Sequence, residues 1–194
     1  MQGRQRATAL MLAVALVVTM AGQAYGARLT TTDDGSDVWS PEGSEYVAAG
    51  SVANTDLLRT SLNHREHRIV GRARYEALTK NTSHEVRLNT QLKTNQGKVY
   101  DVIVMVDPNG EGERLLLFRR WRDNPIECDH AVGTAAWSDE KISFSVPRAC
   151  LGSPRWVKYR AVARSYKEET GLFLDMANHS GPTKNPWSAR VRRD

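Results

Sequence analysis

The 194-residue sequence has only two cysteines and five histidines, and aromatic residues make up 7% of it. It contains no GxSxG nucleophile elbow, no HExxH helix, no glycine-rich phosphate loop and no EF-hand loop. Each of these motifs has a fixed spacing and would be visible. Their absence excludes the common hydrolases, zinc proteases and nucleotide-binding enzymes, whereas catalytic residues assembled from distant segments would leave no such mark.

Long apolar runs are also rare, and the longest lies at the N-terminus. Arg4 and Arg6 precede the run ALMLAVALVVTMA, and small residues follow it in GQAYGA. This order is typical of a secretory signal peptide, and a run of ~13 to 15 residues is shorter than the ~20 that a membrane span needs. We therefore expect a leader over residues 1–26, cleaved after Ala24 or Gly26, and a secreted product without a membrane span. An uncleaved signal anchor is the alternative.

The charge balance is only mildly basic. The leader carries two arginines and no acidic residue, so its removal lowers the net charge from +5 to +3. A strong nucleic-acid binder would need a concentrated basic face, so no nucleic-acid partner is expected. The remaining length suits one domain with a single core, which we expect to be a monomer.

The two cysteines, Cys128 and Cys150, predict one disulfide in an exported chain. Neither lies in a CxxC motif or beside a histidine, so a structural bond is favoured over a redox or nucleophilic role. The loop that they close is worth about 3 kcal/mol in the chain-entropy model.

Apolar residues recur at every second position through most of the chain. Residues 27–54 lack this pattern, are rich in Thr, Ser, Gly and Asp, and predict a flexible linker or arm. From residue 55 onward the pattern and the short connections predict an all-β domain over residues 55–194: a single antiparallel β-sandwich, or flattened barrel, of about seven to nine strands. Expected strands lie at residues 56–64, 67–78, 84–94, 98–106, 114–121, 142–146 and 157–163. The first two are expected to form one hairpin, and the last two, within residues 141–163, to form another around the turn that holds Cys150.

Two segments also resemble known sequences. DLLRTSLNHREHRIVGRARYEAL (residues 56–78) and SFSVPRACLGSPRWVKYRAVA (residues 143–163) are similar to the first hairpin and the cysteine-bearing hairpin of a group of uncharacterised secreted proteins of actinobacteria. The most specific part is VPRACLGSPRWVK. The resemblance implies a secreted, disulfide-tied β domain and no established activity. Gly71 stands where an apolar strand residue is expected, which predicts weak packing or a β-bulge.

The strongest candidate for ligand contact is FRRWRD, residues 118–123. Arg120, Trp121 and Arg122 could offer an aromatic plate for a sugar ring and guanidinium groups for phosphate or carboxylate. The favoured interpretation is simpler, with Trp121 continuing the core face of the strand and the arginines exposed at its rim. Trp156, in the cysteine-bearing segment, is open to the same two interpretations.

Other polar residues carry weaker hypotheses. Asp101 is in phase with apolar strand residues and is either a buried general acid or, as we favour, a solvated residue at the rim. The DPNGEGE loop at residues 107–113 has calcium-type ligands but lacks the distal carboxylate, so a plain turn is favoured, and the acidic residues 33–37 are a weaker candidate still. His64 and His67 flank a predicted turn, where solvated histidines are more plausible than zinc ligands.

The sequence therefore predicts a secreted, non-catalytic recognition or interaction module with no cofactor. Its extracellular ligand could be a glycan, a cell-envelope polymer or a protein. The alternatives are a secreted hydrolase with an unmarked site around Asp101 or residues 107–113, and a structural envelope protein.

Overall fold

Almost all of the regular structure is β-strand. A computed structural model describes residues 27–80, 84–107, 112–167, 171–177, 181–182 and 185–194. Within these ranges there are thirteen strands and two short 3-10 helices, and no helix long and apolar enough to cross a membrane. The strands are β1 Ala27–Thr32, β2 Val38–Glu42, β3 Glu45–Gly50, β4 Leu57–His64, β5 Arg68–Tyr75, β6 His84–Thr94, β7 Val99–Val106, β8 Glu113–Arg119, β9 Val132–Ala136, β10 Lys141–Pro147, β11 Trp156–Lys167, β12 Gly171–Met176 and β13 Val191–Arg192.

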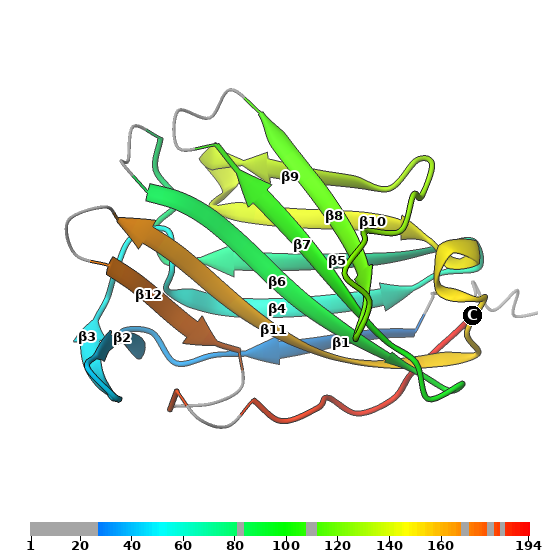
Figure 1. Cartoon of the computed structure of the whole chain (residues 1–194), viewed down its shortest axis with the longest axis horizontal. Coiled ribbons are helices and arrows are strands. Elements are labelled where there is room, and N and C mark those ends of the chain that lie inside the picture. The colour runs from blue at the N-terminus through cyan, green and yellow to red at the C-terminus, as the bar shows by residue number, and fades with distance from the viewer. Residues whose placement is uncertain (1–26, 81–83, 108–111, 168–170, 178–180, 183–184) are drawn as a thin grey trace, which may run out of the picture.

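The strands form two antiparallel sheets that lie one behind the other (Figure 1). Sheet A has the order β1-β4-β5-β10-β9. Sheet B has the order β3-β2-β12-β11-β6-β7-β8, with β13 paired to β11. The predicted all-β sandwich and the Cys128–Cys150 disulfide are therefore confirmed.

The core lies between the sheets and follows the alternation of the sequence. In β6, Val86, Leu88, Thr90 and Leu92 are buried, while the residues that alternate with them, Arg87, Asn89 and Gln91, face outward. The same alternation holds in β7, β10 and β11, since every second residue of a strand lies on the same face. The outward side of sheet B is half-buried and mixed in polarity, which leaves it available for ligand contact.

Residues 141–163 do not form the hairpin that their sequence predicts. β10 pairs with β5 and β9 in sheet A, whereas β11 pairs with β6 and β12 in sheet B. The turn between them contains a 3-10 helix, Arg148–Leu151, and carries the chain from one sheet to the other. The largely buried Arg148 holds this crossover by donating to Glu66 O (2.5 Å) and Pro154 O (2.8 Å). The first predicted hairpin, β4 with β5, is confirmed.

The N-terminal segment also differs from its prediction. Residues 27–54 contain β1, β2 and β3, so they belong to the sandwich and do not merely link to it. β1 pairs with β4 along its whole length, and β2 joins sheet B where Trp39 meets Leu174. The hydrophobic pattern missed these strands because β1 and β3 are edge strands and β2 joins β12 at one residue pair, so backbone hydrogen bonds secure them and they bury few apolar side chains.

Gly71 has a packing role and does not mark a bulge. It faces Phe144 across the regular β5–β10 ladder, and a Cβ atom at residue 71 would lie 2.1 Å from the Phe144 ring. The register shift of β5 lies instead opposite Leu57 and Arg59 of β4. The Phe144 ring therefore occupies the space that a side chain at residue 71 would fill.

Candidate ligand-binding surface

A groove of about 300 Å³ crosses the outward face of sheet B. Its polar walls come from Asn89 and Gln91 of β6, Asp101 of β7, Arg160 of β11 and Asn185 of the C-terminal segment. Ile103, Val162 and Met176 add apolar surface. The groove exists because outward positions of adjacent strands carry amide and charged side chains beside short apolar ones.

A chain of hydrogen bonds fixes these side chains. Gln91 Nε2 donates to Asp101 Oδ1 (2.6 Å), and Arg160 Nε donates to Gln91 Oε1 (2.7 Å). Arg160 Nη1 also donates to Asn185 O (3.0 Å), and its guanidinium lies 4.7 Å from the ring centre of Trp187. Two hydrogen bonds and an aromatic ring thus orient the arginine, so little side-chain freedom remains to be lost on binding.

Two amide oxygens of the groove have no hydrogen-bond partner. Asn185 Nδ2 donates to Ala161 O (3.1 Å), which leaves the buried Asn185 Oδ1 unpaired. Asn89 Oδ1 is also buried and unpaired. An unpaired buried acceptor costs about 1–3 kcal/mol. Neither oxygen is accessible to solvent, so a ligand in the groove would reach them only if the amide groups turned outward.

Trp121 is exposed, so the favoured interpretation of it as a core residue is wrong. Its exposed fraction is 88%, the largest of the exposed apolar side chains in the described structure. β8 ends at Arg119, and Trp121 lies in the following turn with a φ of 68°, so strand alternation no longer sets its direction. The Arg120 guanidinium lies 4.9 Å from the indole ring.

Trp121 also lines a surface hollow of about 540 Å³ with Arg119, Arg122 and Asn124. The turn that carries it is held to β8 by the bond from Ile126 N to Leu117 O (2.6 Å). Cys150 lines the hollow as well, so the disulfide ties its floor to the segment after the turn.

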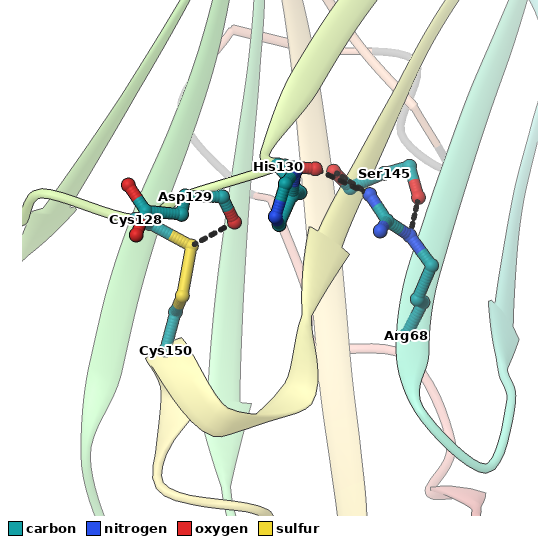
Figure 2. Close-up of a disulfide and its surroundings, with 6 residues drawn as sticks. All are labelled: Arg68, Cys128, Asp129, His130, Ser145 and Cys150. Atoms are coloured by element: carbon teal, nitrogen blue, oxygen red, sulfur yellow. Dashed lines mark hydrogen bonds between the residues drawn. A yellow bond between two sulfur atoms is a disulfide. The ribbon is translucent and has the colours of Figure 1, made fainter.

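The other end of that segment is anchored by Arg68 of β5 (Figure 2). Its guanidinium donates to His130 O (2.5 Å) and to Ser145 Oγ (2.5 Å). Figure 2 shows these contacts beside the Cys128–Cys150 bond, on the side toward β5. Trp121 therefore projects from a segment that the disulfide and these hydrogen bonds hold in place.

Arg120 links the hollow to the groove electrostatically. Burial, and then the charge of Arg120, lower the pKa of Arg160. Trp156 lies outward on β11, four residues before Arg160, and is half-buried with the Arg190 guanidinium 4.7 Å from its ring centre. Of the four predicted contact residues, Arg120, Trp121 and Arg122 thus lie together, and Trp156 lies apart on the same sheet.

The remaining candidates have varied outcomes. Asp101 lies on the outward face of β7, half-buried and paired with Gln91, so it is neither the buried general acid nor the fully solvated rim residue of the two hypotheses. His64 is fully buried, with its Nδ1 3.1 Å from Val191 O, so the prediction of a solvated histidine is wrong. Most of the 107–113 loop lies outside the described residues.

Sequence reasoning missed Arg160, Asn185 and Trp187 as parts of one site. The outward phase of Arg160 was readable from the alternation, but the position of the C-terminal segment against β11 was not. Comparison with protein-family models, curated proteins and solved structures gives no match to this chain.

Proposed function

We propose that the protein is an exported, non-catalytic recognition module that binds a carboxylate-bearing glycan on the outward face of sheet B. The observation that carries this proposal is the groove in which hydrogen bonds fix Gln91 and Arg160, on the same sheet as the turn that exposes Trp121. The amide and guanidinium groups that line the groove would form hydrogen bonds with sugar hydroxyls, and an indole face suits the apolar face of a sugar ring.

The charge of the surface favours an acidic glycan over a neutral one. Arg160 and Arg164 line the groove, and Arg119 and Arg122 line the hollow, against the acids Asp101 and Asp123. Guanidinium groups bind carboxylates through paired, charge-assisted hydrogen bonds. Binding should therefore weaken as salt concentration rises.

The groove supports binding better than glycoside hydrolysis. Among the described residues that line it, Asp101 is the only carboxylic acid, and its Oδ1 already accepts a hydrogen bond from Gln91. Glycosidases of the usual kind need two carboxyl groups on opposite sides of the scissile bond.

Export is part of the proposal, and it is inferred from the signal-peptide pattern of residues 1–26. The disulfide is compatible with an oxidising compartment. The resemblance to secreted actinobacterial proteins agrees with export.

The test is titration of the purified protein with oligogalacturonate, an acidic probe, and with chitin oligosaccharide, a neutral one, by isothermal calorimetry. We expect tighter binding of the acidic probe, and at least a tenfold loss in Trp121→Ala and in Arg160→Ala, about 1.4 kcal/mol each. Tyr166→Ala is the matched control, since Tyr166 is exposed on the same strand as Arg160 and outside the groove.

Equal affinity of all three variants would contradict the proposed surface. Failure of a wider acidic glycan array to bind the folded protein would contradict the ligand class. Capture of a protein partner that Trp121→Ala abolishes would replace the glycan by a protein ligand.

A further inference from the structure

Three aspartates from distant parts of the chain meet at one end of the sandwich. Asp37 immediately precedes β2, Asp56 immediately precedes β4, and Asp175 lies in β12. One carboxylate oxygen of each lies within 4.8 Å of the corresponding oxygens of the other two. This carboxylate cluster lies outside the residues that line the groove and the hollow.

The cluster is buried and its hydrogen bonds are incomplete. Asp56 and Asp175 have no exposed surface, and Asp37 is half-buried. Asp56 Oδ2 accepts from Ser36 N (2.8 Å) and Asp175 Oδ2 from Leu57 N (2.6 Å). The Oδ1 atoms of Asp56 and Asp175, and both carboxylate oxygens of Asp37, are buried without any hydrogen-bond partner.

The charges around the cluster do not compensate the three buried carboxylates. None of the ion pairs among the described residues involves these three aspartates. Burial, followed by the charges of Asp33, Asp37 and Asp56, raises the pKa of Asp175 to about 8. Burial, followed by the nearby carboxyl group of Glu76, raises the pKa of Asp56 to about 6. Buried carboxylates of this kind need either protons or a bound cation.

We propose that Asp37, Asp56 and Asp175 bind a divalent cation, calcium in preference to magnesium. The unpaired oxygens are hard, anionic ligands of the type that both ions take. The three carboxylate oxygens lie within 4.8 Å of one another, so one cation could contact all three. Calcium accepts irregular, carboxylate-rich sites, whereas magnesium demands near-ideal octahedral geometry and retains several waters.

The position of the site indicates its role. The ion would join the β2–β3 ribbon to β4 of sheet A and β12 of sheet B, where only one residue pair, Trp39 with Leu174, links β2 to β12 in the ladder. It would therefore stabilise the N-terminal ribbon against the sandwich. The inference does not depend on glycan binding, because the cluster and the groove are different sites.

Terbium luminescence tests the site directly, since Tb³⁺ substitutes for calcium and Trp39, two residues from Asp37, can sensitise it. We expect tryptophan-excited Tb³⁺ emission from chelator-treated protein, displaced by Ca²⁺ at lower concentration than by Mg²⁺. We also expect millimolar Ca²⁺ to raise the melting temperature by at least about 5 °C relative to chelator, because the ion binds only the folded state.

The variants are Asp37→Asn, at the half-buried position most tolerant of change, and Asp101→Asn as the control at a half-buried carboxylate outside the cluster. Asp37→Asn should lower Tb³⁺ and Ca²⁺ affinity at least tenfold, and Asp101→Asn should leave both unchanged. Absence of a calcium effect on the wild-type melting temperature would overturn the proposal in favour of shared protons. Equal affinities in the two variants would overturn it as well.

Discussion

Gly71→Ala tests the packing of sheet A at its tightest point. The added Cβ atom would lie 2.1, 2.3 and 2.9 Å from three atoms of the Phe144 ring, where ordinary contact begins near 3.4 Å. Gly71 is not among the glycines with positive φ, so the substitution strains the packing and not the backbone. Phe144 is itself buried, so the ring cannot move away without displacing other core residues.

The expected cost follows from two opposing effects. Overpacking a core costs about 1–3 kcal/mol, and replacing glycine by alanine returns about 0.4–1 kcal/mol by restricting the unfolded chain. We expect a net loss of about 2 kcal/mol in the free energy of unfolding, or roughly 4–8 °C in melting temperature for a domain of this size. Gly112→Ala is the control, since a Cβ atom there meets nothing within 4 Å.

A double-mutant cycle identifies the cause. Phe144→Leu alone should cost about 1 kcal/mol by leaving a cavity, and the alanine at residue 71 should fill part of that cavity in the double variant. The cycle, measured by urea denaturation followed by tryptophan fluorescence, should give a favourable coupling of at least about 1 kcal/mol. A stable Gly71→Ala protein, or additive effects, would refute the packing argument.

Further predictions concern the disulfide, pH and Trp121. Replacing both Cys128 and Cys150 by alanine should cost about 3 kcal/mol in urea denaturation, because they are 22 residues apart, and a loss below about 1 kcal/mol would contradict this. Burial and neighbouring carboxylates raise the folded-state pKa of Asp175 to about 8 from 3.8, so the folded state keeps a proton that the unfolded state has lost. In chelator, the free energy of unfolding should therefore fall by about 2 kcal/mol between pH 6.5 and 8, a fall that calcium should remove and that a flat profile would disprove. Trp121→Ala should change stability by less than about 0.5 kcal/mol by thermal denaturation, because the side chain is 88% exposed, and a larger loss would show that the indole supports the fold.

The alternation of apolar residues was enough to predict the sheets but not their connections. Residues 84–94 fold as the strand that their pattern predicts, because one face of β6 lies in the core. The pattern could not show that β10 and β11 belong to different sheets, because a crossover and a hairpin both bury alternate residues. Arg148, whose buried guanidinium holds the crossover, looks like any surface arginine in the sequence.

The candidate sites were harder to predict for a related reason. Trp121 was expected to continue the alternation of the strand. The strand instead ends at Arg119, and Trp121 lies in a turn with left-handed backbone, so its side chain points to solvent. The carboxylate cluster combines residues 37, 56 and 175, of which only the first lies in an acidic run, and the pairing of β12 with β11 and β2 is what brings the third to the others. Such long-range partners are set by topology, which local periodicity does not encode.

The most direct test of the proposed binding face is an NMR titration of the ¹⁵N-labelled protein with oligogalacturonate. We predict that the largest amide shift changes fall on β6, β7, β11 and the turn at Trp121, with little change in sheet A. Shift changes confined to sheet A, or none at saturating ligand, would contradict the assignment of this surface.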